Sequence, residues 1–143
     1  MKNTDKKLKI MLDAGAKMPT RAHGADAGLD IYAATDGVVP SGGSCTFDTG
    51  VHAEIPSGYV GMLKSKSGLN CKHGLVSEGV IDAGYTGSIV VKLYNHSETH
   101  YAVKAGEKIS QLVILPIITP ELELVDSLED TERGNGGFGS TGK

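Results

Sequence analysis

The residues best suited to chemistry gather at the C-terminal end of the sequence. Five of the eleven residues in 133–143 are glycine, and the same stretch carries Arg133, Phe138, Ser140, Thr141 and a final lysine. Glycine loses the most backbone entropy on ordering, so the segment is expected to be mobile without a ligand. Cationic side chains and free backbone N–H groups bind phosphate oxygens, and an aromatic ring stacks on a base. The pattern predicts a lid that closes over a nucleotide.

Two other interpretations of this segment compete with the lid. Residues 137–143 spell G-x-x-x-x-G-K, which is most of a P-loop. A P-loop also needs a Ser or Thr after the lysine, a strand before it and a helix after it, and the sequence supplies neither the hydroxyl nor the helix. A P-loop is therefore not expected. A glycine-rich terminus with no role stays open on composition alone.

A second candidate site surrounds Asp82. The segment 79–85, Gly-Val-Ile-Asp-Ala-Gly-Tyr, is typical of a hairpin in which apolar residues precede a carboxylate and a tyrosine follows. An aspartate beside apolar residues is expected to be partly desolvated and could act as a base toward water. The alternative is that Asp82 only forms a turn and that Tyr85 packs in the core.

Three further segments combine small residues with isolated polar side chains. Residues 64–68, Lys-Ser-Lys-Ser-Gly, suit an anion site at a helix start, or equally an ordinary capped helix with solvated lysines. The acids of residues 24–30 could orient a hydrated divalent cation, although a turn carboxylate is the simpler interpretation. Gln111 lies within an apolar strand and needs a polar partner, from the protein or from a ligand.

Strands must position these segments, because the dominant period of the apolar pattern is two. Leu8, Ile10 and Leu12 recur at every second position, and Leu122 and Leu124 alternate with Glu121 and Glu123. In 89–94 one face of a strand would carry Ile89, Val91 and Leu93, and the other Val90, Lys92 and Tyr94. Turns rich in Gly and Pro separate the runs. Many short strands with frequent turns indicate an all-β barrel or jelly roll.

One short helix and one two-faced strand depart from that pattern. Residues 67–74 are predicted to be helical, with Ser67 as the N-cap and Gly74 as the C-terminal stop. Residues 109–118 are apolar on both faces of a strand, which a single small sheet cannot bury. This strand is expected in the centre of a sandwich or at a contact between subunits.

Composition and charge narrow the classes of function. With 143 residues, of which 39% are hydrophobic, the chain is expected to form one soluble domain. A net charge of −3 gives no electrostatic case for nucleic acid as a partner. No apolar run approaches the roughly 18 residues of a membrane span, and no signal peptide is evident. Two cysteines and five histidines show no disulfide or metal spacing, so we expect a cytoplasmic protein with reduced thiols.

Taken in order, these segments resemble the five motifs of the homotrimeric dUTP diphosphatase (dUTPase) family over essentially the whole chain. The third and fifth motifs are the most specific. The resemblance implies an all-β fold, a distorted jelly-roll barrel of the dUTPase-like β-clip type, with one short helix and a flexible Gly-rich C-terminal arm. It divides the chain into a barrel domain, 1–130, and its lid, 131–143. The matching segments are 26–33, 65–69, 79–87 with Asn95 beyond it, 106–112 and 133–142.

The resemblance also implies an activity, the hydrolysis of dUTP to dUMP and pyrophosphate, which limits uracil in DNA and supplies dUMP for dTMP synthesis. Three active sites would lie between the subunits of a homotrimer, each using all three chains. Asp82 would orient and deprotonate the water that attacks the α-phosphorus. Tyr85 would lie beneath the deoxyribose and exclude a 2′-hydroxyl, and backbone groups at Gly79 and Val80 would read uracil.

The remaining implied roles concern the triphosphate and its metal. Mg²⁺ would be held mainly by phosphate oxygens, with Asp30 contacting its waters. Phe138 would cover the uracil. The triphosphate would meet residues of the second, fourth and fifth motifs, namely Lys66, Ser67, Gly68, Gln111, Arg133, Gly139, Ser140 and Thr141.

One departure from the family pattern bears on phosphate binding. Lys66 stands where the second motif usually has arginine, which keeps the charge but loses the planar fork, so activity is expected with an altered phosphate affinity. Three alternatives rank lower. A dCTP deaminase on the same scaffold would release ammonia from dCTP, a phage-type regulator would bind a partner protein under the control of dUTP, and a purely structural β trimer would not need five intact motifs.

Overall fold

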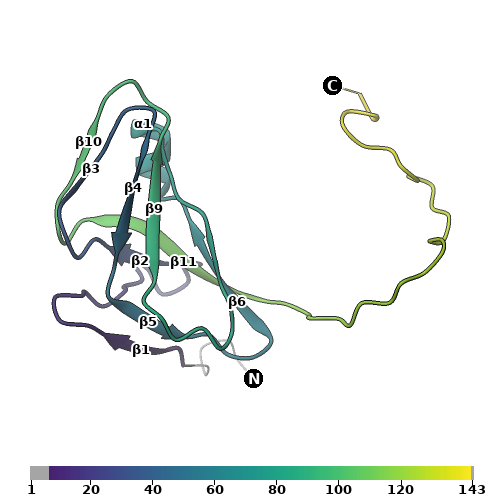
Figure 1. The fold of residues 1–143 in the computed structure, drawn as a ribbon, viewed down its shortest axis with the longest axis horizontal. Helices are drawn as coiled ribbons and strands as arrows, with labels where there is room; N and C mark the ends of the chain where they lie inside the picture. The colour runs from purple at the N-terminus through teal and green to yellow at the C-terminus, as the bar shows by residue number, and fades with distance from the viewer. Residues whose placement is uncertain (1–6, 143) are drawn as a thin grey trace.

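Eleven short strands and one helix make up the regular structure of residues 7–142, the part of the chain that the computed structural model describes (Figure 1). The expectation of an all-β fold with one short helix is therefore confirmed. In chain order the elements are β1 (Lys9–Leu12), β2 (Gly28–Tyr32), β3 (Gly37–Val39), β4 (Ser44–Asp48), β5 (Val51–Glu54), β6 (Tyr59–Lys64), α1 (Ser67–His73), β7 (Leu75–Val76), β8 (Gly79–Ile81), β9 (Val90–Asn95), β10 (Tyr101–Val103) and β11 (Lys108–Pro116).

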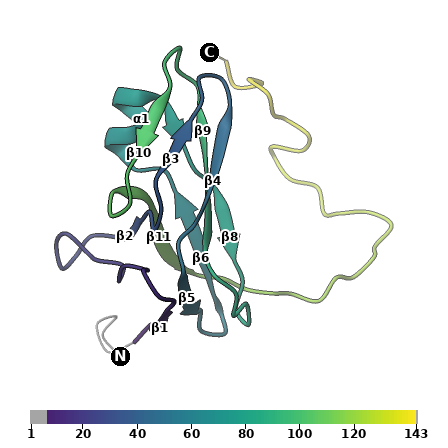
Figure 2. The ribbon, with the colours of Figure 1, turned by 60° about the vertical axis from the view of Figure 1, so that its left-hand side comes forward.

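The strands form two larger antiparallel sheets and two small ribbons (Figure 2). One larger sheet has the order β2-β11-β6-β8 and the other the order β4-β9-β7, while β1 pairs with β5 and β10 with β3. Apolar side chains of both larger sheets belong to one buried cluster, with Leu63 and Leu112 from the first and Phe47, Val91 and Leu93 from the second. The fold thus packs two sheets of short strands around one core, and neighbouring strands are often distant in sequence. This agrees with the all-β barrel or jelly roll that the period-two pattern predicts.

Strand β9 follows the predicted alternation closely. Ile89, Val91 and Leu93 are buried, whereas the intervening residues 90, 92 and 94 are exposed. Asn95, at the end of this strand, is also buried, and its amide nitrogen donates to the carbonyl oxygens of residues 39 and 99 at 3.0 and 2.8 Å. Asn95 therefore builds the turn that follows it, which accounts for its presence beside the third motif.

The N-cap of the helix lies one residue before the predicted one. Lys66 occupies the N-cap position with an extended backbone and makes no capping hydrogen bond with its side chain, so the prediction of Ser67 as N-cap is wrong. The Lys66 side chain is bonded to Asp30 instead. Gly74 ends the helix as predicted, with a left-handed φ of 65° and its N–H bonded to the carbonyl of Asn70.

Strand β11 is an inner strand of the four-stranded sheet, and its first half is therefore buried between β2 and β6. Leu112 pairs with Leu29 of β2 on one side and with Leu63 of β6 on the other, and it is fully buried. Burial fades toward the end of the strand, since Leu115 is 45% exposed and Ile118, just beyond it, is 86% exposed. Only the first half of this two-faced segment therefore sits in the sandwich of one chain.

Residues 117–142 carry no strand or helix and run away from the body of the protein (Figures 1 and 2). The strand predicted from the alternation at 121–124 is wrong, because no sheet edge lies beside it and its two leucines are 97% and 99% exposed. No helix within residues 7–142 has the length and hydropathy of a membrane span.

Candidate functional site

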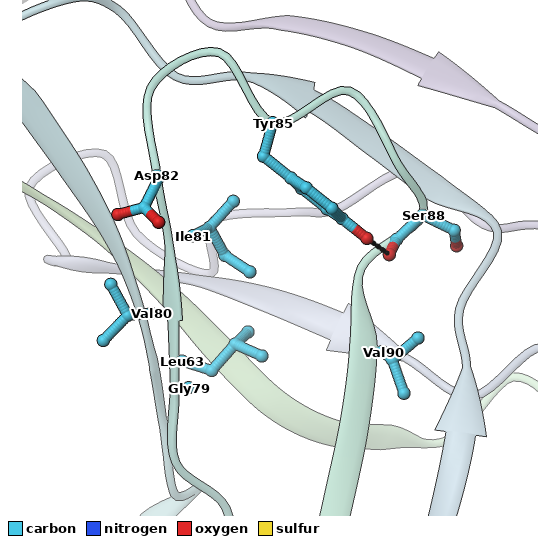
Figure 3. A pocket seen from close by; sticks show the side chains of 8 residues that line it. All are labelled: Leu63, Gly79, Val80, Ile81, Asp82, Tyr85, Ser88 and Val90. Atoms are coloured by element: carbon cyan, nitrogen blue, oxygen red, sulfur yellow. Dashed lines mark hydrogen bonds between the residues drawn. The ribbon is translucent and has the colours of Figure 1, made fainter.

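A pocket of about 220 Å³ lies beside the turn that connects β8 to β9 (Figure 3). Strand β8 pairs with β6, with Val80 opposite Met62. The N–H of Tyr85 donates to the carbonyl of Asp82 at 3.2 Å and closes the turn, and Gly84 supplies a φ of 90° that other residues rarely adopt. The structure brings four predicted site residues together in the lining, which consists of Leu63, Gly79, Val80, Ile81, Asp82, Tyr85, Ser88 and Val90.

The Asp82 side chain belongs to the lining of this pocket and is exposed (Figure 3). It makes no hydrogen bond or ion pair with any side chain or backbone group among residues 7–142. The expectation of partial desolvation by neighbouring apolar residues is therefore wrong for the single chain. Its place in the fold explains this, because the strand ends at the buried Ile81 and Asp82 stands in the turn just beyond it. Its oxygens remain available to a water molecule or a ligand.

Tyr85 forms a wall of the pocket and does not pack in the core, so the core alternative is wrong. Its side chain is 45% exposed, and its hydroxyl donates to the carbonyl oxygen of Ser88 at 2.9 Å (Figure 3). The ring covers Gly87 so closely that a methyl group there would lie 2.4 Å from the tyrosine oxygen. Gly87 thus allows the ring to lie flat along the chain that follows the turn.

A second pocket, of about 270 Å³, collects the predicted phosphate and metal residues. Its polar lining comes from β2 and the turn before it, from the segment before α1 and from β11. Gln111 donates from its side-chain nitrogen to the carbonyl of Ser65 at 2.9 Å, which supplies the polar partner that this strand position needs. A methyl group on Gly28 would lie 2.0 Å from the Gln111 side-chain oxygen, so that glycine makes room for the amide. The lining is Ala22, Asp26, Ala27, Gly28, Asp30, Lys66 and Gln111.

The two acids of the first motif have different tasks. Asp26 is the turn carboxylate, since it accepts from the backbone N–H of His23 at 3.0 Å. Asp30 belongs to β2, is almost fully buried and contacts the ammonium groups of Lys66 and Lys108, the latter at 3.0 Å. Burial raises the pKa of the Asp30 carboxyl, but the hydrogen bonds and charges of both lysines outweigh it, and the net pKa is lowered. Asp30 therefore stays ionised.

The start of α1 borders the second pocket and suits an anion. Its first turn holds no acidic residue, and no side chain caps it, so the N–H groups near Ser67 and Gly68 lack intrahelical partners. Buried hydroxyls beneath the segment keep it in place. The hydroxyl of Ser77 contacts that of Ser110 at 2.8 Å, and Ser110 donates to the carbonyl of Lys64 at 3.0 Å. These hydrogen bonds attach the segment before α1 to buried hydroxyls of β11 and of the connection between β7 and β8.

The predicted lid residues lie far from both pockets of their own chain (Figures 1 and 2). Arg133 donates from Nε to the carbonyl of Gly136 at 2.8 Å, and Ser140 donates its N–H to the carbonyl of Gly137 at 3.1 Å. Phe138 is fully exposed and has a positive φ of 52°. Gly139 and Thr141 belong to the same exposed run of turns. The chain thus holds three separate groups of candidate residues.

The donor set fits a hydrated hard cation better than a directly ligated one. No group of three or more His, Cys, Asp or Glu side chains within residues 7–142 has the geometry to hold a metal. The second pocket offers carboxylate and amide oxygens, but both oxygens of Asp30 already accept from lysines. These residues are compatible with a Mg²⁺ ion that brings waters and phosphate oxygens of its own.

With this geometry established, comparison with known proteins shows the family. The model of the dUTPase family matches residues 14–142. This chain belongs to the dUTPase family. Among curated relatives, the deoxyuridine 5′-triphosphate nucleotidohydrolase of Kluyveromyces lactis is 42% identical, over 95% of this chain and 94% of that one. The corresponding protein of Clostridium tetani is 41% identical, over 98% and 99%.

Solved dUTPase structures have the same fold. A variant of the Staphylococcus bacteriophage 80alpha dUTPase, determined with dUpNHpp, has a TM-score of 0.91 and 36% identity, covering 96% of this chain and 99% of that one. A variant from phage phi11 of S. aureus, described as coordinating a structural Mg(II) ion, has a TM-score of 0.81 and 34% identity, covering 87% and 100%. These dUTPases confirm the expected β-clip fold.

Several residues at these sites were not anticipated from the sequence. Lys108 contacts Asp30, although its position at the start of an apolar strand signals only a solvated charge. Ser88 receives the Tyr85 hydroxyl through its backbone, which no side-chain pattern could reveal. Gly28, which follows the first motif's Asp-Ala pair, could have been found, since a glycine inside a strand often marks a close approach.

Proposed function

We propose that this chain hydrolyses dUTP to dUMP and pyrophosphate by attack of water on the α-phosphorus. The observation that carries the proposal is the pocket in which an unpaired carboxylate, Asp82, and an aromatic wall, Tyr85, meet the end of strand β8. The match of residues 14–142 to the dUTPase family supports the choice of substrate. In cells this reaction limits uracil in DNA and supplies dUMP for dTMP synthesis, and we assign the protein to the cytoplasm.

The reaction is phosphoryl transfer to water, and the protein contributes positioning and charge. Asp82 is the general base, since its oxygens have no partner among the described residues and can accept a proton from water. One such base contributes about 10²–10⁴-fold. Substrate and lid together would supply the desolvation that the exposed carboxylate lacks in one protomer.

The hairpin reads the nucleoside. Strand β8 is an edge strand of its sheet, so the backbone groups of Gly79 and Val80 that face away from β6 have no ladder partner. They are available to the edge of uracil. A narrow hairpin excludes thymine because of its methyl group, and it excludes cytosine because the backbone donors and acceptors are the reverse of those that cytosine needs. Tyr85 lies beneath the deoxyribose, where its fixed ring rejects a 2′-hydroxyl.

The second pocket takes the triphosphate with its metal. Lys66, Ser67, Gly68 and Gln111 contact phosphate oxygens, and Asp30 accepts hydrogen bonds from the waters of Mg²⁺. When bound, Mg²⁺ neutralises charge on the phosphates. The lysine at position 66 supplies a point charge in place of a bidentate fork, so phosphate affinity differs from that of an arginine enzyme.

The complete site is shared among three copies of the chain. One protomer separates the hairpin pocket, the phosphate pocket and the tail, which supports the assembly of each site from neighbouring subunits of a homotrimer. Residues 131–143 act as the lid of the 1–130 barrel domain, with Arg133 on the γ-phosphate and Phe138 over the uracil. Gly139, Ser140 and Thr141 close over the terminal phosphate with their hydroxyls and amides.

The test is pyrophosphate release with Mg²⁺ from dUTP, measured beside UTP, dTTP, dCTP and dUDP. Release from dUTP alone is the expected result. Release from UTP at a similar rate would refute the role of Tyr85, and ammonia from dCTP would point to a deaminase instead. Binding of dUTP without any release would refute the hydrolytic function and favour a regulatory relative.

A further inference from the structure

The side chain of His52 connects three parts of the fold that are distant in sequence. It projects from β5, and its side chain is only 18% exposed. Its Nδ1 lies 2.8 Å from the carbonyl oxygen of Thr86, in the turn after β8, and its Nε2 lies 3.0 Å from a carboxylate oxygen of Asp13, after β1. The imidazole thus ties the hairpin turn to the β1-β5 ribbon.

These two contacts require a protonated ring. A neutral imidazole has one N–H donor, so one of its nitrogens would direct a lone pair at an acceptor oxygen. Only the imidazolium donates to both Asp13 and Thr86. The hydrogen bond to Asp13 raises the pKa of His52 most, followed by the hydrogen bond to the Thr86 carbonyl; burial opposes them, and the charges of Asp13 and Asp48 add to the rise. Asp13 and Asp48 are the charged groups that act on this ring.

Thr86 directly follows the tyrosine that walls the first pocket. The hydroxyl of Tyr85 bonds to the carbonyl of Ser88, and the hydroxyl of Ser88 bonds to the carboxylate of Asp48. The chain from 85 to 88 is therefore fastened at two points, to His52 through a carbonyl and to Asp48 through a hydroxyl. Both points lie within three residues of Tyr85, and the tyrosine ring rests directly on Gly87 between them.

We propose that His52, as an imidazolium, is a positioning residue that holds the Thr86 carbonyl and thereby keeps Tyr85 where it discriminates deoxyribose from ribose. The link to the sugar rests on the proposed function. The tether, by which we mean the contacts of the His52 imidazolium with Thr86 and Asp13, does not depend on that function. Because the pKa of His52 is raised, the tether is complete below the ordinary histidine value of about 6.5 and is lost as pH rises through the higher folded value.

The tether is tested first without any nucleotide. The His52 ring and the amides of residues 86 and 87 are followed by NMR from about pH 6 to about pH 9, a range that covers a raised histidine titration. We expect the ring and both amides to share one midpoint, which Asp13→Asn moves to lower pH. Amides that do not respond at the ring's midpoint, or a midpoint unchanged by Asp13→Asn, would overturn the tether.

The link to the sugar is tested by the ratio of kcat/KM for dUTP to that for UTP over the same pH range. In the wild type this ratio should fall as pH rises through the NMR midpoint. In His52→Gln the ratio at low pH should be lower than that of the wild type by roughly 3- to 10-fold, which is the effect of one hydrogen bond. The ratio of this variant should also show no change at the NMR midpoint. His96→Gln, an exposed histidine at the far end of β9, is the matched control and should keep the wild-type profile.

The outcomes separate the two proposals. A wild-type protein that hydrolyses no nucleotide refutes the proposed function, while the shared NMR midpoint still decides the tether. A His52→Gln ratio equal to that of wild type at every pH overturns the role in sugar discrimination. If His52→Gln does not fold, Asp13→Asn replaces it, because the aspartate is 55% exposed and its loss only weakens the imidazolium.

Discussion

Two glycine-containing segments, the hairpin 79–88 and the tail 117–142, are both assigned to the nucleotide, yet the fold treats them differently. The hairpin begins in a strand paired with β6 and ends beside the buried Ile89, with Tyr85 and Thr86 bonded in between. The tail is attached at its start, where the N–H of Ile117 donates to the carbonyl of Gly58 at 2.9 Å, and beyond that point it has only bonds between near neighbours, such as that of Arg133 to Gly136. Glycine content alone does not predict mobility, since anchoring at both ends decides it.

The difference implies a division of labour. The hairpin is ordered when the protein folds, so its groups can discriminate substrates without a further loss of conformational entropy on binding. The tail must be ordered each time a nucleotide is enclosed, and part of its contact energy is consumed by that ordering. Hairpin changes should therefore alter the chemistry and specificity, whereas tail changes should alter closure and leave the fold intact.

The largest expected effect comes from the hairpin carboxylate. Asp82→Asn removes the base but keeps the shape of the side chain, so kcat for dUTP should fall by at least about 10²-fold with nucleotide binding retained. Steady-state turnover and calorimetric binding of a non-hydrolysable dUTP analogue measure the two quantities. Asp36→Asn, a distant aspartate bonded to the N–H of Ala105, is the control. Normal turnover in Asp82→Asn would remove the base assignment.

Removing the tail comes next. Deletion of residues 131–143 should leave a folded protein, since none of residues 131–142, the part of this stretch that the structure describes, belongs to the buried core. It eliminates a stacking contact of about 1–3 kcal/mol and charged hydrogen bonds of similar size, offset by the entropy of ordering. We expect kcat/KM to fall by about 10²-fold. Unchanged thermal melting beside lost turnover is the signature, and a truncated protein that kept full kcat would refute the lid.

The only two phenylalanines of the chain make a sharper comparison. Phe47 is 1% exposed in the core and Phe138 is fully exposed on the tail. Phe138→Ala should leave the melting temperature unchanged and reduce kcat/KM by about tenfold, within the range of one lost stacking contact. Phe47→Ala should lower the free energy of unfolding by about 3–5 kcal/mol. Equal effects of both changes on stability would contradict the assigned places of these rings.

Sequence periodicity predicted what is locally encoded and missed what depends on distant partners. The alternation at 89–94 identified β9 because burial alternates along any half-buried strand. The same alternation at 121–124 gave a wrong strand, since a strand also needs a neighbouring edge. The family motifs collected the pocket residues, but the pairing of Lys108 with Asp30 and of His52 with Thr86 joins segments that no local pattern relates.

Side-chain exposure was harder to predict than strand position. Asp82 follows apolar residues, and only its place beyond the end of β8 explains why it faces solvent. Lys66 at the N-cap of α1 is likewise explained by its contact with Asp30, which overrides the local preference for a serine cap. In both cases the outcome depends on the three-dimensional fold, namely on where β8 ends and on a partner 36 residues away, and not on the neighbouring sequence.

The smallest effect concerns the second anchor of the hairpin. Asp48 accepts hydrogen bonds from the hydroxyl of Ser88 and from the N–H of Gly50, and these lower the pKa of its carboxyl. A lowered pKa in the folded state means that the stabilisation is complete above the ordinary value of 3.8 and is lost as pH falls through the folded value. Because Asp48 is exposed, the loss should be less than about 1 kcal/mol.

Thermal melting of the wild type and of Asp48→Asn between about pH 5 and about pH 3 measures this loss. The wild type should lose slightly more stability on acidification than the variant, which has no carboxyl to protonate. Ser88→Ala removes the main donor and should show the same reduced sensitivity, whereas Asp126→Asn on the tail should match the wild type. If Asp126→Asn reduced the acid sensitivity as much as Asp48→Asn, the tail would contribute anchoring contacts of its own, and the contrast between a fastened hairpin and a loose tail would fail.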